Sequence, residues 1–558
     1  MRARWKSLAS VVSLSLLGIA AVAPPPASAV AERPTRVLII VLDQMRPDYV
    51  HRFSMDNVRS LMRGGVNFPR AILGHMAAET VVSHNVITSG QLPKHMGWTN
   101  EVYRDVNNTL GGGEGEYYVT SSLACEQFGT LINAAGYPKL EDYLGRGGPD
   151  AKFVAIGNKT TASCTAGQPA VDGVDNDIIV RLGSAASRDC DGDGMLEDWR
   201  GPSGVNVPTY VSAVCGRFYV ETSNSFGTET TPPAWMYPAD GARYITGNDP
   251  RHLGGDVWAA DAAVKVMRND PDWDGMLVSM PSIDKTGHMW GTDDTGPSGV
   301  GDDVYDFAHL PKAARIADRQ VGKLLGELEA QGIDDETLVV LTTDHAGQTA
   351  DRFHGINEPD RSDFNWYYGE DADETYLSPS PAIARLVNGL DGNLAFSYQD
   401  GHIATWLHNT SNARKLDAAK ALADLPDVIA TYTRSGERYV ERFRDLSRTA
   451  AGERSWFINN AQRLINTMAA ADGNGPDAVA LLRDDTSYGV KGDHGGHQKA
   501  IQRIPIAFSW PGLRSGAEPL TRIRSVDLLP TILQLLGISE DANHPMDGRA
   551  VNLPLRHE

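Results

Sequence analysis

Three stretches of the chain share one pattern, an unbroken apolar run that stops at an aspartate. They are Thr35–Asp43 (TRVLIIVLD), Gly275–Asp284 (GMLVSMPSID) and Thr337–Asp344 (TLVVLTTD). Runs of this length are too short for a capped helix, whereas a parallel strand buried on both faces has this composition. The pattern therefore predicts three central strands, each of which ends in a carboxylate.

Helical patterns precede two of these strands. Apolar residues recur at helical spacing in Trp258–Arg268 and in Ala313–Gln331, and near the C-terminus Arg503–Phe508 indicates a strand that is followed by an amphipathic helix, Ser525–Gly537. Alternating helices and buried strands predict an α/β fold with a doubly wound, mostly parallel sheet. Ligands of such sheets bind beyond the carboxyl ends of the strands, where the three aspartates stand.

Two long stretches of different composition interrupt this core. Residues 105–250 are rich in Gly, Ser, Thr, Asn and aromatic residues, and residues 351–480 combine polar loops with helical segments around Ala413–Leu422 and Gly452–Ala471. We interpret both as insertions that cap the C-terminal edge of the sheet. The predicted division is a signal peptide at 1–29, core segments at 30–104, 251–350 and 481–558, and cap insertions at 105–250 and 351–480.

The first residues have the pattern of a secretory signal. Arg2, Arg4 and Lys6 precede an apolar run, Val11–Val22, and the small-residue site that ends at Ala29. This order is typical of a signal peptide cleaved after Ala29. The apolar run is shorter than the roughly 20 residues that span a bilayer, which disfavours the alternative of a membrane anchor. We predict a secreted protein without a membrane anchor after cleavage.

All four cysteines, Cys125, Cys164, Cys190 and Cys215, lie in the first predicted insertion. An even number of cysteines in an exported protein indicates disulfides, here two, for which three pairings are possible. Four free buried thiols are the alternative, and they suit a cytoplasmic protein better.

The chain is strongly acidic. Its 558 residues include 51 Lys+Arg against 71 Asp+Glu, a net charge of −20 that becomes −23 when residues 1–29 are removed. Because a phosphate backbone rewards a positive surface, we expect no bulk binding of nucleic acid. A phosphate ligand would need cations concentrated at one place in the protein.

Histidines accompany the predicted acidic strand ends. Three motifs combine the two residue types: Asp284 with His288, Asp344 with His345, and Asp493 with His494 and His497 in a glycine-rich loop. With Asp43, these groups supply enough ligands for two metal ions that keep positions open for a substrate. Mixed Asp/His sets without cysteine select borderline metals, Zn²⁺ first and then Mn²⁺ or Fe. The alternative is a set of unconnected polar loops.

These motifs resemble those of a known family. The segments VLIIVLD (Val37–Asp43), SIDKTGH (Ser282–His288), TTDHAG (Thr342–Gly347) and GDHGG (Gly492–Gly496) are similar to the metal motifs of the alkaline phosphatase superfamily. The likeness is greatest to the type I phosphodiesterase/nucleotide pyrophosphatase branch, and it covers nearly all of the core but not the insertions. It implies one metal bound by Asp284, His288 and His494 and another bound by Asp43, Asp344 and His345.

The resemblance also implies a nucleophile. The family's nucleophile pattern falls on Thr80, which would contact a metal and form a phospho-threonine. A threonine hydroxyl is a poor nucleophile at neutral pH and needs a metal to stabilise its alkoxide. Ser83, Thr88 and Ser89 are the alternatives, with Thr80 then an ordinary helix or cap residue.

Three further residues have roles that the resemblance implies. Asn100 would donate to a phosphoryl oxygen and stabilise charge in the transition state, the alternative being an ordinary turn residue. Lys159 would match the lysine of the Lys-x-Arg pair with which monoesterases bind substrate, but Thr161 stands in the place of the arginine. His497 would lie beside the metal without binding it, or would replace His494 as ligand.

One acidic loop in the first insertion resembles a calcium-binding loop. It has Asp189, Asp191 and Asp193 in alternation and Gly194 at position six, although Arg200 occupies position twelve, where such loops have glutamate. A structural Ca²⁺ there would help the disulfides to hold the cap, and an acidic surface turn is the alternative.

The sequence therefore predicts a secreted two-metal phosphohydrolase that cleaves small phosphate esters, with phosphodiesters or nucleotide pyrophosphates preferred. One alternative is a phosphate monoesterase of the alkaline phosphatase type that uses the same site. A non-catalytic extracellular metal-binding protein is the alternative from another class, and the presence of Thr80 together with every metal ligand disfavours it.

Overall fold

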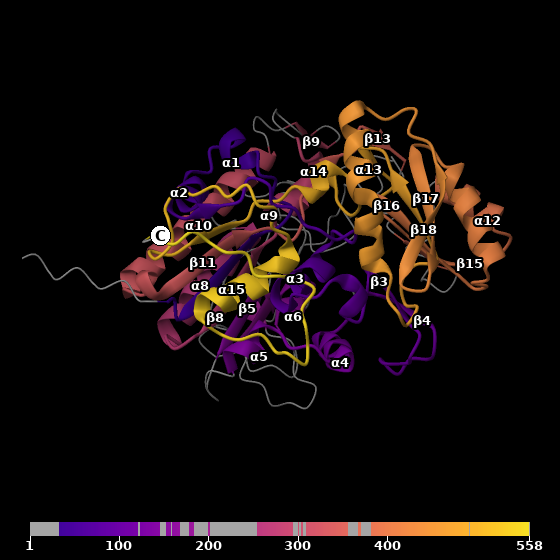
Figure 1. Cartoon of the computed structure of the whole chain (residues 1–558). Coiled ribbons are helices and arrows are strands. Elements are labelled where there is room, and N and C mark those ends of the chain that lie inside the picture. Colours follow the sequence, from indigo (N-terminus) through magenta and orange to yellow (C-terminus); the bar gives the residue numbers. More distant parts are fainter. Residues whose placement is uncertain are drawn as a thin grey trace, which may run out of the picture.

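The structure of the chain is a computed structural model (Figure 1). It describes residues 33–120, 123–145, 152–157, 159–167, 178–182, 199–200, 254–293, 299–300, 303–304, 309–354, 367–369, 381–489 and 492–556. Several predictions fall outside these residues: the signal peptide at 1–29, the candidate calcium loop with Asp189, Asp191 and Asp193, and the pairing of Cys190 and Cys215.

A central sheet forms the core of the molecule. Its described strands are, in spatial order, β2 (Val66–Asn67), β22 (Ala507–Ser509), β11 (Thr337–Thr342), β1 (Arg36–Leu42), β8 (Gly275–Met280), β5 (Phe153–Gly157), β6 (Ile178–Leu182) and β7 (Trp199–Arg200). The strands from β11 to β6 pair in parallel, whereas β22 pairs antiparallel with β11 and β2, and β7 pairs antiparallel with β6. The predicted α/β fold with a mostly parallel sheet is confirmed.

The predicted strand ends are correct for two strands and wrong for the third. Asp43 follows β1 directly, and Asp344 lies just beyond β11. Asp284 was expected at the end of a strand, but β8 stops at Met280 and Asp284 lies in the first turn of α9 (Ser282–Trp290). The reason is Pro281, which lacks the N–H that would continue the ladder and takes the N-cap position of the helix.

Part of the first predicted insertion, residues 105–250, belongs to the central sheet. Its segments 153–157 and 178–182 form β5 and β6 of the central sheet, next to β8. It also contains β4 (Glu116–Val119), which forms a hairpin with β3 (Val102–Asp105) at its boundary, and the helices α4 (Cys125–Ala135), α5 (Leu140–Gly145) and α6 (Thr160–Ala166). The two strands were missed because both are short and lie in a polar, glycine-rich context.

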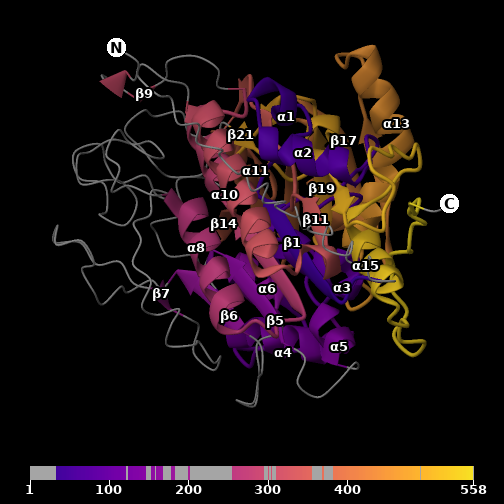
Figure 2. The same ribbon diagram turned by 90° about the vertical axis from the view of Figure 1, so that its left-hand side faces the viewer.

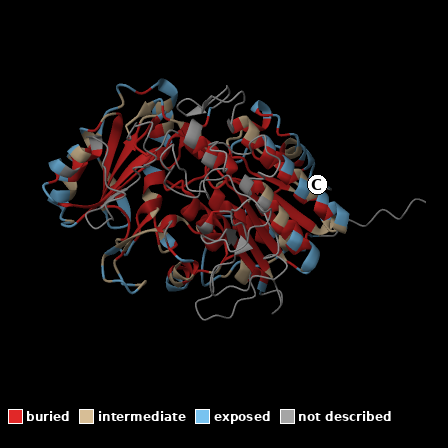
Figure 3. Cartoon of the chain, turned by 180° about the vertical axis from the view of Figure 1, so that it is seen from behind, coloured by how far each residue is buried: buried red, intermediate tan, exposed pale blue. Residues whose placement is uncertain are grey.

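Helices cover both faces of the sheet. Leu38, Ile40 and Leu42 of β1 pack in one apolar cluster with α2 (Asp56–Gly64), α8 (Gly254–Asn269) and α10 (His309–Gln331). The intervening residues of β1 pack on the other face with α15 (Leu528–Leu536). In Figure 2, α8 and α10 lie on one side of β1 and α15 on the other. Figure 3 shows the strands as the buried layer between helices whose outer faces are exposed. Consecutive residues of β1 thus face opposite cores, as the unbroken apolar run requires.

The second predicted insertion forms most of another sheet. Its strands, in spatial order, are β14 (Tyr367–Gly369), β15 (Leu394–Gln399), β16 (His402–Leu407), β19 (Ala478–Leu482), β17 (Val428–Ser435) and β18 (Arg438–Arg444), and every pairing is antiparallel. The helices α12 (Asn412–Ala423) and α13 (Ala451–Ile465) overlap the helical segments predicted there. In Figure 1 this sheet and its helices, in orange, stand beside the core.

The two sheets meet over one helix, α3 (Thr80–Ser89). Val81 and Val82 of this helix share an apolar cluster with Phe457 of α13 and with Val479 and Leu481 of the second sheet. The remaining described elements are short: α1 (Tyr49–Arg52), β9 (Gly299–Val300), β10 (Asp303–Val304), β12 (Gln348–Thr349), β13 (Arg352–Phe353), α11 (Pro381–Gly389), β20 (Thr486–Ser487), β21 (Gly492–Asp493) and α14 (Lys499–Gln502).

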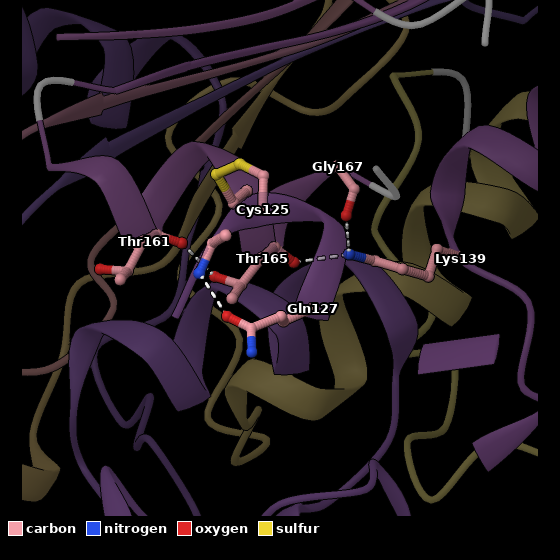
Figure 4. Close-up of a disulfide and its surroundings, with 8 residues drawn as sticks. Cys125, Gln127, Lys139, Thr161, Thr165 and Gly167 are labelled. Carbon is pink, nitrogen blue, oxygen red and sulfur yellow. Dashed lines mark hydrogen bonds between the residues drawn. A yellow bond between two sulfur atoms is a disulfide. The ribbon is translucent and has the colours of Figure 1, made fainter. Parts of the chain in front are cut away.

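A disulfide fastens α6 to α4. Cys125 is the first residue of α4, and its Cα lies 5.2 Å from that of Cys164 in α6. Next to this disulfide, at the C-terminal end of α6, the Nζ of Lys139 donates to the carbonyl oxygens of Thr165, at 2.5 Å, and of Gly167 (Figure 4). A lysine at this position satisfies carbonyls that a helix C-terminus leaves unpaired. One of the two predicted disulfides is therefore present, and it holds the helix that begins directly after Lys159.

Among the described residues, no helix combines the length and the apolar character that crossing a membrane requires.

Candidate active site

The first candidate metal cluster joins α9 to the loop that follows β21. Asp284, His288 and His494 present ligand atoms within 4.8 Å of one another. The helix places Asp284 and His288 one turn apart, with Nε2 of His288 3.1 Å from Oδ1 of Asp284. Nδ1 of His288 lies 2.8 Å from the carbonyl oxygen of Gly492, so it donates its proton there and leaves the lone pair of Nε2 for a metal.

The second cluster lies at the ends of the adjacent strands β1 and β11. It contains Asp43, Asp344 and His345, again with ligand atoms within 4.8 Å of one another. Nε2 of His345 is 3.5 Å from Oδ1 of Asp43 and 3.5 Å from Oδ2 of Asp344. The other Asp344 oxygen accepts the backbone N–H groups of His345, at 2.9 Å, and of Gln44, at 3.3 Å. These bonds orient Asp344 so that Oδ2 faces the cluster.

The two clusters are neighbours, because the rings of His345 and His494 stack with their centroids 3.8 Å apart. Each of the six side chains is buried. Burial raises the pKa of Asp43 well above its usual value, and the charges of Asp284 and Asp344 raise it further. Burial lowers the pKa of His345 to about 4, which keeps its imidazole neutral and able to bind a metal. The carboxylates repel one another and the imidazoles offer lone pairs, so the residues present fit two divalent cations of the zinc type.

Lys159 links the predicted nucleophile to both clusters. Its Nζ lies 2.8 Å from Oγ1 of Thr80, 2.6 Å from Oδ2 of Asp43 and 2.7 Å from Oδ2 of Asp284. Burial alone would lower the pKa of Lys159, but the charges of Asp284, Asp43 and Asp344 raise it, so the ammonium stays charged. The structure thus brings Lys159, a predicted substrate-binding residue, to the hydroxyl of Thr80.

Thr80 is the first residue of α3, where the positive end of the helix dipole favours an anion. The alternative nucleophiles are placed differently. Thr88 donates to the carbonyl oxygen of His84 at 3.2 Å, and the Ser89 hydroxyl accepts the N–H of Gln91 at 3.1 Å. Ser83 is fully buried in α3. The geometry therefore favours Thr80 over the other hydroxyl residues of this helix.

Asn100 is fully buried, and its described side-chain contacts are with residues outside the two metal clusters. Its Nδ2 lies 3.1 Å from Nε2 of His402 and 3.9 Å from the sulfur of Met468. The contact of Asn100 with a phosphoryl oxygen stays a prediction.

His497 lies outside both clusters, whereas His494 belongs to the first. The ring of His497 meets that of Phe457 edge-on at 5.4 Å, and its carbonyl oxygen accepts the indole N–H of Trp456 at 2.6 Å. His494 is therefore the better placed of the two to bind a metal with Asp284 and His288, and its role as the ligand stays a prediction.

Three polar residues of the site were not predicted. Gln44, which has a left-handed backbone (φ 61°), donates from Nε2 to Oδ1 of Asp284 at 3.1 Å. His84 lies with Nδ1 2.9 Å from the carbonyl oxygen of Thr80, and Nε2 2.9 Å from the Ser279 hydroxyl. His75 is fully buried, and burial lowers its pKa to about 3. Gln44 could have been predicted because it directly follows Asp43 in the sequence. His84 could have been predicted because it lies four residues after Thr80, one helical turn away.

Comparison with known proteins agrees with this arrangement. The sequence model of the type I phosphodiesterase/nucleotide pyrophosphatase family matches residues 37–111 and 198–414, which together are more than half of the chain. No curated protein sequence matches the chain significantly.

Two solved structures have the same fold. Wild-type alkaline phosphatase PafA is 14% identical, with a TM-score of 0.60 over 93% of this chain and 98% of that chain. Murine ectonucleotide pyrophosphatase/phosphodiesterase 5 is 12% identical, with a TM-score of 0.53 over 92% of this chain and 97% of that chain. These likenesses show the fold, and the family match identifies the chain as a phosphoric ester hydrolase that belongs to the type I phosphodiesterase/nucleotide pyrophosphatase family.

Proposed function

We propose that this protein is a secreted phosphohydrolase that uses two metal ions and forms a phosphorylated Thr80 as its intermediate. The observation that carries the proposal is the position of the Thr80 hydroxyl, which contacts the one ammonium group that also contacts Asp43 and Asp284. A substrate phosphorus placed beside Thr80 would therefore lie close to both clusters of metal ligands.

The residues for the two metals follow from the clusters. Asp284, His288 and His494 would hold one ion, and Asp43, Asp344 and His345, together with Thr80, would hold the other. When bound, two divalent cations, Zn²⁺ in this proposal, supply the positive charge that favours the Thr80 alkoxide and a phosphate ester substrate.

Thr80 performs the covalent step. Its oxygen attacks phosphorus in line, and the new O–P bond forms as the bond to the leaving alcohol or phosphate breaks. Water then attacks phospho-Thr80 from the opposite side, which releases phosphate or a phosphate monoester and restores the hydroxyl. Lys159 donates to the Thr80 oxygen and stabilises its negative charge. Asn100 would contribute a donor to a phosphoryl oxygen.

The preferred substrates are phosphodiesters or nucleotide pyrophosphates. The family match supports this preference, and so does Thr161, which stands where monoesterases of the superfamily have arginine. A structure of inactive murine ectonucleotide pyrophosphatase/phosphodiesterase 5 contains AMP, which makes nucleotides sensible probes for this protein.

Phosphate monoester hydrolysis is the second candidate, and Lys159 is the observation that favours it. A monoester carries two charges and benefits from a protein cation beside the metals. The Nζ of Lys159 lies 2.8 Å from the Thr80 hydroxyl, within reach of a phosphoryl oxygen there.

The nucleophile is tested with Thr80→Ala and Thr80→Ser variants, using bis(p-nitrophenyl) phosphate as a diester and p-nitrophenyl phosphate as a monoester. We expect Thr80→Ala to lower kcat by at least roughly 10³-fold and Thr80→Ser to retain part of it. Acid quenching during turnover, digestion and mass spectrometry should show phosphate on the peptide that contains residue 80. Thr88→Ala, in the same helix, is the matched control and should keep wild-type activity.

Full turnover by Thr80→Ala would refute the role of this residue. Hydrolysis of neither reporter by wild-type protein that contains both metals would instead favour a non-catalytic metal-binding protein. The ratio of the two wild-type rates decides between the diester and monoester preferences. Secretion is tested separately, by determining whether the exported chain begins at Val30.

A further inference from the structure

A third group of buried ligands includes Glu79, the residue directly before Thr80. Glu79, Asp400 and His402 present ligand atoms within 4.8 Å of one another, and all three side chains are fully buried. We infer that these residues form a third site for a divalent cation, separate from the two catalytic clusters.

The three residues come from both halves of the structure. Glu79 is the N-cap residue of α3, whereas Asp400 lies in the turn between β15 and β16, and His402 is the first residue of β16. Nδ1 of His402 is 2.7 Å from Oδ1 of Asp400.

Two oxygen atoms of the group lack partners. Oδ2 of Asp400 and Oε1 of Glu79 form no hydrogen bond with the described residues, and Nδ1 of His402 contacts the other oxygen of Asp400. Buried carboxylate oxygens without a partner cost free energy unless a ligand satisfies them. The second oxygen of Glu79 is held by the backbone N–H of Glu101 at 2.8 Å, which fixes the carboxylate in place.

The negative charge of the two carboxylates also favours a bound cation. No lysine or arginine within the described ranges forms an ion pair with Glu79 or Asp400. Two carboxylates removed from water and left without a counter-charge would be strongly destabilising. A divalent cation would neutralise both and satisfy the unpaired oxygens at once.

The backbone at Gly495 passes so close to Asp400 that only a glycine fits there. Gly495 has a left-handed conformation (φ 71°), and a Cβ atom there would overlap Oδ2 of Asp400. The N–H of Gly401 donates to the carbonyl oxygen of His494 at 2.7 Å, and the N–H of Gly495 donates to that of Ala78 at 3.1 Å. The proposed cation would thus join the second sheet to the segment before Thr80, beside the loop that carries His494.

The ligand set indicates the class of metal. Two carboxylates and one imidazole suit Zn²⁺ or Mn²⁺, whereas Mg²⁺ and Ca²⁺ prefer oxygen alone. A cation on Nδ1 leaves the proton on Nε2 of His402, which would then donate to the side-chain oxygen of Asn100. Occupancy of the site would therefore set which end of the Asn100 amide faces His402.

The test counts bound metal ions. Wild-type protein is equilibrated by dialysis with Mn²⁺ alone, and in a second series with Zn²⁺ alone, and the ions per chain are measured by mass spectrometry. Asp400→Asn and Glu79→Gln should each bind one ion fewer than wild type. Asp318→Asn is the matched control, because it removes a buried carboxylate that binds Val58 N–H and Asn57 in the core, and its count should equal that of wild type.

An unchanged count in Asp400→Asn and Glu79→Gln would overturn the inference and leave a proton shared between the two carboxylates. If either variant fails to fold, His402→Gln gives the same comparison, with loss of one ion expected. His288→Asn separates this inference from the proposed function, because it should lose an ion from the first cluster while Asp400→Asn loses a different one. The double variant should then lose both, and loss of the same single ion in all three would also overturn the third site.

Discussion

The Nζ of Lys159 lies 2.8 Å from Oγ1 of Thr80 and bridges that hydroxyl to a carboxylate from each metal cluster. The same ammonium can therefore stabilise a charged oxygen on Thr80 and compete with cations for Asp43 and Asp284. Two opposite effects of its removal follow.

Lys159→Met should lower kcat/KM for p-nitrophenyl phosphate by roughly 10- to 100-fold, the equivalent of one charge-assisted hydrogen bond of about 1.5–3 kcal/mol. The loss should be smaller for the singly charged diester, and the affinity for Zn²⁺ should rise. Steady-state kinetics and metal titration measure both effects. Lys152→Met, which removes a lysine paired with Asp270 and Asp272 just before β5, is the control. Equal losses for both esters would argue against contact with the phosphoryl group.

Removal of the metals should abolish hydrolysis and destabilise the fold, because Asp43, Asp284 and Asp344 would remain buried together. A cation at 100 times its Kd contributes about 2.7 kcal/mol, so chelation should lower Tm by roughly 5 °C or more. Thermal unfolding and activity are measured before and after chelation, and again after Zn²⁺ is restored. A metal-free protein, verified by elemental analysis, that keeps its activity and Tm would contradict the two-metal proposal.

Replacing Cys125 and Cys164 by serine should destabilise the protein by about 2–4 kcal/mol, since the disulfide closes a separation of 39 residues. Because α6 begins directly after Lys159, the variant should also lose activity at temperatures below its own Tm. Circular dichroism melting and kinetics at several temperatures test this. Lys139→Met is the comparison, because it frees the C-terminal end of α6 and leaves the disulfide intact. A Tm that does not change would show that packing alone holds α6.

Asp256 should make stability depend on pH. Its carboxylate accepts the N–H of Ser282 at 3.0 Å, at the start of α9, and burial raises its pKa to about 6. The unfolded carboxyl has its ordinary pKa of 3.8, so between pH 4 and 6 the folded state holds the extra proton. The free energy of unfolding therefore falls as pH rises through this window, by roughly 3 kcal/mol in total, and stays low above it.

Asp256→Asn keeps the oxygen that accepts from Ser282 but does not titrate. The stability of the variant relative to wild type should therefore increase between pH 4 and pH 7. The difference in the free energy of unfolding between variant and wild type at each pH cancels the contribution of the titrating groups that both proteins share. A constant difference across this range would mean that Asp256 titrates normally.

The sequence predicted the central sheet and both metal clusters because each signal is local. An apolar run that ends at Asp43 or Asp344 defines a buried strand and its carboxyl end together. The predicted end of β8 was wrong, because Pro281 ends the strand although apolar residues surround it. The strands β5 and β6 were missed because both are short and lie in a polar, glycine-rich context.

The third cluster could not be predicted from the sequence, because its residues are distant from one another along the chain. Glu79 and Asp400 are separated by more than 300 residues, and neither lies in a metal motif. Only the packing of the second sheet on α3 brings them together. Gln44 and His84 were nearer to detection, because each stands close in sequence to a predicted site residue.

The alternation along β1 has a consequence for how this site can change in evolution. Val37, Ile39 and Val41 belong to one core and Leu38, Ile40 and Leu42 to the other, so inserting or deleting a single residue would exchange the two faces. The position of Asp43 relative to the alternating faces of β1 is therefore fixed, and this residue can vary only by substitution. His494 follows the short strand β21 in a buried loop, where backbone hydrogen bonds with Gly401 and Ala78, and not strand alternation, fix the position of this ligand.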